Sequence, residues 1–161
     1  MTVRVGHGRD LHRTDDGRPL VLGGVLIEEG PGLSGHSDAD VLLHAITDAL
    51  LGAIGRGDLG SHFPPDDPRW KDADSADFLR KALAWAESEG WALVNVDATV
   101  VAERPRLRPY VEHLRRRIAE ILGVEPGAVN VKVKSGEGLG PIGEGLAMEA
   151  EAVVLVAKRT S

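Results

Sequence analysis

The sequence predicts an α+β fold in which a single mixed β-sheet carries helices on one of its faces. Two observations lead to this expectation. Segments rich in apolar and β-branched residues recur along the chain, and between them lie longer segments whose apolar residues follow helical spacing. The chain also lacks internal repeats, long linkers and low-complexity tracts, so residues 1–161 are expected to form one domain of ordinary size.

The first half of the chain predicts two strand segments and a long helix. Residues 3–12 favour a strand, and residues 20–27 favour a hairpin because a pair of glycines divides them. Residues 37–54 favour a helix, with Ser37 as its N-cap and an apolar stripe along one side. Residues 55–71 contain several prolines and glycines, so turns are expected there.

The second half predicts further helices and strands. One helix is expected over residues 75–89, where a glycine follows its end, and another over residues 109–122, which begins with a proline. Residues 92–102, 129–134 and 146–157 favour strands, the last because it is rich in β-branched residues. With helices on one face only, the other face of the sheet needs a cover, and association between copies of the chain is the simplest one.

Composition narrows the chemistry open to this chain. It has no cysteine, which excludes thiolate metal ligands and cysteine nucleophiles, so any metal must be held by nitrogen and oxygen atoms. The formal net charge of −6 argues against a general nucleic-acid binder. No apolar run approaches the ~20 residues of a membrane span. The first residues have neither signal nor transit character, so a cytoplasmic location is expected.

Two side chains of the first strand segment are candidates for half of a metal site. Asp10 and His12 are two residues apart, a spacing that points both side chains to the same side of a strand. His7 has the opposite parity and is left out. The alternative is that Asp10 and His12 are ordinary polar residues in a turn.

The first long helix supplies a third candidate ligand, His44. Asp40, His44 and Asp48 are four residues apart and share one helical face, so either aspartate could accept a hydrogen bond from the imidazole N–H that does not bind metal. The alternative is a solvated acidic face with an incidental histidine. Combined with Asp10 and His12, His44 would leave a fourth coordination position open, which is typical of a catalytic zinc site.

A glycine-rich segment and an arginine-rich loop are candidates for binding phosphate. Lys134 and Ser135 begin a segment with several glycines after a predicted strand, and its backbone N–H groups could approach an anion. Within this segment, Glu137 could hold a hard cation such as magnesium. Residues 104–109 form a cationic loop stiffened by proline. Each has an ordinary alternative, a plain connection for the first and solvated arginines for the second.

Four motifs taken together resemble one enzyme family over essentially the whole chain. They are Gly6-His7-Gly8-Arg9-Asp10-Leu11-His12, His36-Ser37-Asp38-Ala39-Asp40 followed by His44, Thr47-Asp48-Ala49-Leu50-Leu51-Gly52-Ala53, and Gly57-Asp58-Leu59-Gly60 with Phe63-Pro64. In this order they are similar to the motifs of 2-C-methyl-D-erythritol 2,4-cyclodiphosphate synthase.

This resemblance implies a homotrimeric phosphorus–oxygen lyase of the non-mevalonate isoprenoid pathway, with sheets packed inward and active sites between neighbouring subunits. The implied substrate is 4-diphosphocytidyl-2-C-methyl-D-erythritol 2-phosphate. Its 2-phosphate attacks the β-phosphorus of the same molecule, which releases CMP and closes 2-C-methyl-D-erythritol 2,4-cyclodiphosphate.

The resemblance also implies roles for individual residues. The implied metal ligands are Asp10, His12 and His44 for zinc, and Glu137 for magnesium or manganese. The residues implied to stabilise the transition state are His36 and Ser135. The implied substrate-binding residues are Ser37, Asp58, Gly60, Phe63 and Lys134, with Ala102, Pro105, Arg106, Leu107 and Arg108 around the cytidine.

Two other classes of function remain open on sequence grounds. A metal-dependent phosphohydrolase would use the zinc to activate water and would release a linear phosphate. A non-catalytic trimeric module that binds a metal or a nucleotide would have no turnover to lose when His36 and Ser135 are removed. The identity of the products and the effect of removing these two side chains distinguish the three functions.

Overall fold

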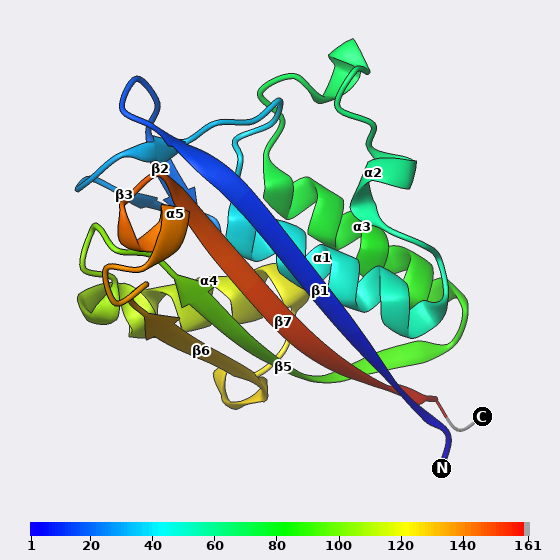
Figure 1. The fold of residues 1–161 in the computed structure, drawn as a ribbon. Helices are drawn as coiled ribbons and strands as arrows, with labels where there is room; N and C mark the ends of the chain where they lie inside the picture. The colour runs from blue at the N-terminus through cyan, green and yellow to red at the C-terminus, as the bar shows by residue number, and fades with distance from the viewer. Residues whose placement is uncertain (160–161) are drawn as a thin grey trace.

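The computed structural model describes residues 1–159 and contains one five-stranded mixed sheet with the long helices on one face (Figure 1). The strand order is β4–β1–β7–β5–β6. Strands β5 and β6 run parallel, and the other neighbouring pairs in this sheet are antiparallel. The strands are β1 (Val3–Asp15), β4 (Gly32–Leu33), β5 (Trp91–Val101), β6 (Val129–Lys134) and β7 (Ala147–Lys158). The predicted α+β architecture is therefore confirmed.

The segment predicted as a hairpin forms a separate two-stranded sheet. Strand β2 (Leu20–Leu22) pairs antiparallel with β3 (Val25–Ile27). The two connecting glycines have φ angles of 57° and 73°, and positive φ at both central residues is what a type I′ hairpin turn requires. The ends of both strands are buried in the core, so this hairpin packs its apolar side against the main domain.

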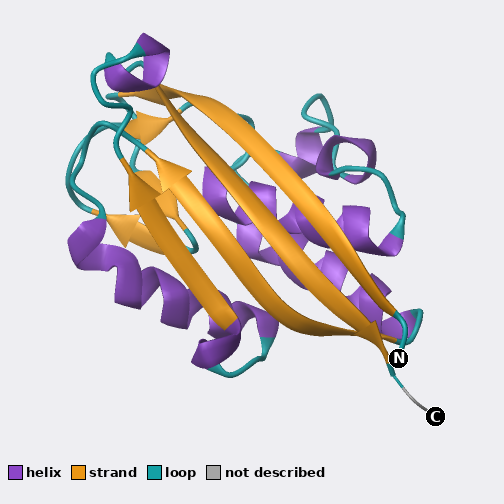
Figure 2. Cartoon of the chain, turned by 60° about the horizontal axis from the view of Figure 1, so that its bottom comes forward, coloured by secondary structure: helices purple, strands orange, loops and turns teal. Residues whose placement is uncertain are grey.

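Helices α1 (Val41–Ile54), α3 (Ser75–Ser88) and α4 (Val111–Leu122) lie behind the sheet in both ribbon views (Figures 1 and 2). Helix α1 packs on β1 and β7, α4 packs on β6, and α3 packs beside α1. The shorter elements are α2 (Leu59–His62), α5 (Gly140–Gly143) and the 3₁₀ helices η1 (Pro68–Trp70), η2 (Arg108–Tyr110) and η3 (Pro126–Ala128). The predicted helix over residues 109–122 therefore begins with a 3₁₀ turn.

Helix α1 lies unusually close to β1 because the strand presents glycines to it. A methyl group added at Gly6 would stand 1.7 Å from the carbonyl oxygen of Ala49, so the two backbones touch without intervening side chains. Alanines on the helix and glycines on the strand therefore set the distance between these two elements. This close packing buries nearly all of α1 and brings its first turns against the middle of β1.

The predicted N-terminus of α1 is wrong. Ser37 does not cap the helix; Asp40 does, and its carboxylate accepts a hydrogen bond of 2.9 Å from the Leu43 N–H. The chain before Asp40 passes through Ala39 with a φ angle of 57°, a left-handed conformation that cannot continue a helix. Helix α1 therefore begins at Val41, four residues after the predicted N-cap Ser37.

Among residues 1–159, no helix covers the sheet face opposite α1, α3 and α4 (Figure 2). Gly6 and Gly8 face α1, so the odd-numbered residues of β1 point to the opposite face. Exposed apolar side chains on that face include Val3, Val5 and Leu11 of β1 and Val153 of β7. Among residues 1–159, no helix has the length and hydropathy needed to span a membrane.

Candidate active site

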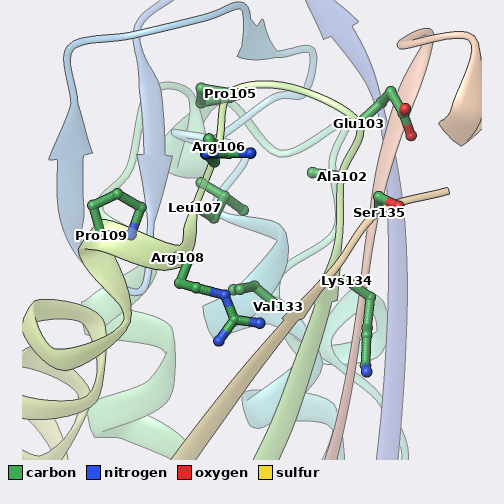
Figure 3. A pocket seen from close by; sticks show the side chains of 10 residues that line it. All are labelled: Ala102, Glu103, Pro105, Arg106, Leu107, Arg108, Pro109, Val133, Lys134 and Ser135. Carbon is green, nitrogen blue, oxygen red and sulfur yellow. The ribbon is translucent and has the colours of Figure 1, made fainter. Parts of the chain in front are cut away.

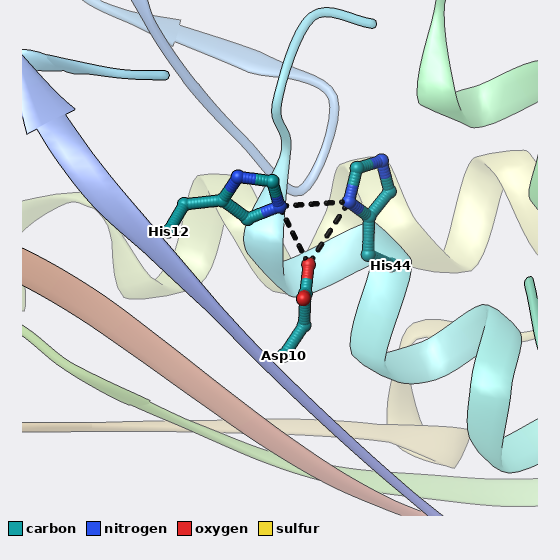
Figure 4. Close-up of side chains that lie close together, drawn as sticks. All are labelled: Asp10, His12 and His44. Atoms are coloured by element: carbon teal, nitrogen blue, oxygen red, sulfur yellow. Dashed lines mark hydrogen bonds and ion pairs between the residues drawn. The ribbon is translucent and has the colours of Figure 1, made fainter. Parts of the chain in front are cut away.

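Asp10, His12 and His44 form a compact cluster where β1 passes the first turns of α1 (Figure 4). Nε2 of His12 lies 2.8 Å from Oδ2 of Asp10, and Nδ1 of His44 lies 3.0 Å from the same oxygen. The two ring nitrogens are 3.3 Å apart. The expected convergence of these three side chains from a strand and a helix is therefore confirmed.

The geometry of this cluster fits a zinc ion. Ligand atoms ~2.0–2.1 Å from a tetrahedral zinc ion lie about 3.3 Å from one another. The three separations in the cluster are 2.8, 3.0 and 3.3 Å, so small side-chain movements suffice to bind such an ion. Two nitrogen donors and one oxygen donor also leave a fourth position for an oxygen atom of a ligand.

The charges in the cluster favour an ionised aspartate. Burial raises the pKa of the Asp10 carboxyl, but hydrogen bonds from His12 and His44 outweigh it and hold the pKa well below its ordinary value. Burial lowers the pKa of His12, whereas the hydrogen bond and charge of Asp10 raise it, and the net direction is upward. The carboxylate thus attracts positive charge into this position, and a bound cation would replace the proton shared with the imidazoles.

Each histidine is oriented through the ring nitrogen that faces away from the cluster. Nδ1 of His12 lies 2.6 Å from the carbonyl oxygen of Ser34, which can only accept, so Nδ1 donates and Nε2 is the ring nitrogen that faces the cluster. Nε2 of His44 lies 2.8 Å from the hydroxyl oxygen of Ser75. The two histidines therefore present different ring nitrogens to the cluster, Nε2 for His12 and Nδ1 for His44.

The expectation that Asp40 or Asp48 supports His44 is wrong. The Asp40 carboxylate is buried and accepts backbone hydrogen bonds from the β2–β3 turn and from Leu43. The Asp48 carboxylate accepts a hydrogen bond of 2.6 Å from the Leu59 N–H. This face of α1 is also buried rather than solvated, since His44 is only 7% exposed. Both aspartates therefore fix loops around the helix and leave the histidine to other partners.

A pocket of about 280 Å³ opens beside the cluster. Its lining includes eight of the residues predicted for the site: Asp10, His12, His36, Ser37, His44, Asp58, Gly60 and Phe63. Trp70 and Phe78 also line it, although the sequence did not single them out for function. The helical spacing of Phe78 marks it as an ordinary core residue, yet its ring stacks on Phe63 with centroids 4.4 Å apart. The pocket therefore combines an apolar aromatic wall with the metal cluster.

Two predicted residues of this pocket are already held by the surrounding loops. Nε2 of His36 lies 3.0 Å from the carbonyl oxygen of Asp67, which requires Nε2 to be the donor. The Asp58 carboxylate caps α2 and accepts hydrogen bonds from the backbone N–H and the hydroxyl of Ser61, which lower its pKa. Both side chains are thus positioned before a ligand binds.

A second pocket, with a volume of about 670 Å³, lies at the ends of β5 and β6 (Figure 3). Its lining contains seven further predicted residues: Ala102, Pro105, Arg106, Leu107, Arg108, Lys134 and Ser135. The two segments meet because the Ala102 N–H donates to the Lys134 carbonyl oxygen over 2.9 Å. The arginine loop and the glycine-rich segment, far apart in sequence, therefore build one cationic pocket.

Glu137 is not among the residues that line either pocket. Its exposed carboxylate accepts a hydrogen bond of 3.1 Å from the Ser135 hydroxyl, and its own N–H donates to the Ser135 oxygen. The Gly136 N–H donates to the Glu103 carboxylate over 3.0 Å. Ser135 and Glu137 thus share one tight loop at the rim of the cationic pocket.

The two pockets have no lining residue in common. The cluster is on β1, whereas the cationic pocket lies at the ends of β5 and β6, and β7 lies between β1 and β5. Inter-strand steps of ~4.8 Å put β5 about 10 Å and β6 about 14 Å from β1. Within one chain, the residues predicted for a single active site therefore form two separate halves.

Fold and site together define a class: an α+β protein with one main sheet, a three-residue cluster that could hold a metal ion, and a separate cationic pocket. The model of the YgbB family matches residues 3–157. The chain therefore belongs to the YgbB family.

Named relatives share both sequence and fold with this chain. The 2-C-methyl-D-erythritol 2,4-cyclodiphosphate synthase of Geobacillus kaustophilus (strain HTA426) is 54% identical over 155 residues, which cover 96% of this chain and 98% of that protein. A solved structure of 2C-methyl-D-erythritol-2,4-cyclodiphosphate synthase in its CDP-bound form has a TM-score of 0.88 at 38% identity and covers 96% of this chain and 100% of its own. IspF of Plasmodium falciparum in complex with CDP has a TM-score of 0.86 at 34% identity and covers 98% and 97%, respectively.

Proposed function

We propose that this chain is a 2-C-methyl-D-erythritol 2,4-cyclodiphosphate synthase of the non-mevalonate isoprenoid pathway. The enzyme converts 4-diphosphocytidyl-2-C-methyl-D-erythritol 2-phosphate to 2-C-methyl-D-erythritol 2,4-cyclodiphosphate and releases CMP. The single observation that carries this proposal is the Asp10, His12 and His44 cluster, with its open fourth position, in a chain 54% identical to a named synthase.

The chemistry is an intramolecular phosphoryl transfer. An oxygen of the 2-phosphate forms a bond to the β-phosphorus, the bond from that phosphorus to the bridging oxygen breaks, and the electron pair leaves with CMP. The reacting phosphate is already an anion, so the protein needs no nucleophile of its own. Positioning and charge stabilisation must supply most of the rate. By this chemistry the enzyme is a phosphorus–oxygen lyase.

We assign zinc to Asp10, His12 and His44, and magnesium or manganese to Glu137. Bound there, these cations would neutralise phosphate charge and reduce the repulsion between the reacting groups. The nitrogen and oxygen donors of the cluster suit zinc. The lone exposed carboxylate of Glu137 suits a cation that is otherwise held by substrate phosphates and water.

The chain's own side chains bind and orient the substrate. His36 and Ser135 are assigned to the transition state, where each places an N–H or O–H donor near developing negative charge. Lys134 supplies a cation for the phosphates. The residues assigned to the methylerythritol portion are Ser37, Asp58, Gly60 and Phe63, and those assigned to the cytidine are Ala102, Pro105, Arg106, Leu107 and Arg108.

We further propose that residues 1–161 form one synthase domain that assembles as a cytoplasmic homotrimer with active sites between subunits. Two features support this assembly. The uncovered sheet face carries exposed apolar side chains, among them Val5 and Leu11. The metal cluster and the cationic pocket share no lining residue in one chain, so a partner's cationic pocket beside the cluster would complete the site.

Product analysis tests this proposal. Purified enzyme is incubated with the substrate, zinc and magnesium, and phosphorus NMR follows the products. We expect CMP and the cyclic diphosphate in equal amounts. CMP with a linear phosphate would identify a hydrolase, and substrate binding without turnover would identify a binding module. Removal of the His36 and Ser135 side chains in separate variants should reduce turnover while CDP binding is retained.

A further inference from the structure

The second ring nitrogen of His44 is in contact with a hydroxyl group that comes from a distant part of the chain. Ser75 is the first residue of α3, is fully buried, and places its Oγ 2.8 Å from Nε2 of His44. A second hydroxyl, that of Ser37, lies farther from the same nitrogen at 3.3 Å. Ser75 is therefore the nearer hydrogen-bond partner of this imidazole.

The proton of the Ser75 hydroxyl is already used. Ser75 Oγ donates to Oδ1 of Asp38, and the Ser75 N–H donates to Oδ2 of the same carboxylate over 3.0 Å. Asp38 also accepts the Asp40 N–H at 3.1 Å, so backbone donors hold the carboxylate in place. A hydroxyl has a single proton, and once it is donated to Asp38 the oxygen can only accept from His44.

This direction of donation determines which nitrogen of His44 carries a hydrogen. Nε2 must carry an N–H, and Nδ1 is then the nitrogen that faces Asp10 and His12, where a bound cation would replace the hydrogen that Nδ1 shares with the Asp10 carboxylate. A metal ligand must present a lone pair, which Nδ1 does once that hydrogen is replaced. The opposite tautomer would direct an N–H at the metal position and would have to be reversed before binding.

We propose that Ser75, itself oriented by Asp38, is a positioning residue for the metal ligand His44: it keeps the ring hydrogen on Nε2 and directs Nδ1 toward the metal position. The inference rests on the proposed metal site. It gives a role to Asp38 of the His36–Asp40 motif, which no step of the proposed reaction uses. Partners of this kind at other metal sites change metal affinity by about 10- to 100-fold when removed.

The first experiment reads the tautomer directly. Long-range ¹⁵N–¹H correlation spectra of metal-free wild-type protein show which ring nitrogens of His44 carry a hydrogen. We expect a hydrogen on Nε2 of His44 in the wild type, and in Ser75→Ala a fraction of molecules with hydrogen on Nδ1 alone. A wild-type His44 that carries hydrogen on Nδ1 alone overturns the proposal, and this measurement needs no zinc.

The second experiment measures zinc affinity by chelator competition. Ser75→Ala is expected to weaken zinc binding by about 10- to 100-fold, and Ser75→Thr, which keeps the hydroxyl, should remain within about threefold of wild type. The control is Ser88→Ala, the same change at an exposed serine of the same helix. Wild-type zinc affinity in a folded Ser75→Ala overturns the role of Ser75. Absence of zinc binding in the wild type would instead refute the proposed metal site. The NMR measurement of the His44 ring hydrogens would then still test the role of Ser75.

Discussion

Gly8 of β1 and Ala45 of α1 are in direct backbone contact, such that a methyl group added at Gly8 would stand 2.0 Å from the Ala45 carbonyl oxygen. Ala45 follows His44, and Gly8 precedes Asp10 by two residues on the same side of the strand. The contact between a glycine and an alanine therefore sets the distance between the helix and strand that carry the metal cluster.

The first prediction concerns Gly8→Ala. The added methyl group must push α1 away from β1, which should lower the free energy of unfolding by about 1–3 kcal/mol and move His44 away from Asp10. Urea unfolding and zinc titration measure the two effects. Gly127→Ala is the matched control, because a methyl group at Gly127 meets nothing within 4 Å. Wild-type stability together with wild-type zinc affinity in Gly8→Ala would contradict this account of the packing.

The second prediction concerns Arg106→Ala in the cationic pocket (Figure 3). Loss of a charged hydrogen-bond donor to the nucleotide should raise KM for the cytidine substrate by about 10- to 100-fold, with little change in kcat. Steady-state kinetics gives both constants. Arg116→Ala removes an exposed arginine from the outside of α4 and should leave KM unchanged. A fall in kcat at constant KM would mean that this loop does not serve nucleotide binding.

The third prediction concerns Glu137→Gln. The amide keeps the shape of the carboxylate but loses its charge, so the magnesium concentration needed for half-maximal activity should rise about tenfold or more. Activity is measured across a magnesium titration at saturating zinc. Glu125→Gln, an exposed glutamate ahead of β6, serves as the control. An unchanged titration curve would remove Glu137 from the second metal site.

The fourth prediction concerns pH and Asp40. Burial raises the pKa of this carboxyl to about 6, although backbone N–H groups from the β2–β3 turn and Leu43 lower it. The folded state thus binds the proton more tightly than the unfolded chain, so this group favours folding most at low pH. That contribution declines as pH rises from about 4 to about 6, by roughly 3 kcal/mol in total, and is constant above.

Asp40→Asn removes this titration. The stability of wild type relative to Asp40→Asn should therefore fall between pH 4 and pH 6, as measured by urea unfolding of metal-free protein across that range. The variant also loses one acceptor for the turn, but that loss is the same at every pH. A stability difference that is independent of pH, or that grows as pH rises, would show that burial does not raise the pKa of Asp40 in the folded protein.

Local patterns in the sequence were sufficient to predict the sheet, the long helices and the cluster. Asp10 and His12 share a side of a strand by parity, and His44 belongs to a helix whose apolar spacing is plain. The start of α1 was missed because the left-handed backbone at Ala39 has no clear sequence signal. Alanine, unlike glycine or asparagine, does not mark a position where a positive φ angle is expected.

Long-range contacts were the other source of error. The hydrogen bond between His44 and Ser75 connects residues 31 positions apart in the sequence. Helical spacing identifies only near neighbours on the same helix as partners of His44, here Asp40 and Asp48. The separation of the predicted site into two pockets likewise depends on the strand order, which places β7 and β5 between β1 and β6. Neither feature follows from periodicity, because periodicity describes one element at a time.

The central claim is that Asp10, His12 and His44 bind one zinc ion, and elemental analysis of purified protein tests it most directly. We predict one zinc per chain in the wild type and less than about a tenth of that in His44→Ala, with the fold retained by circular dichroism. His113→Ala, which removes an exposed histidine of α4, should keep the full amount. Equal zinc content in wild type and a folded His44→Ala would contradict the account.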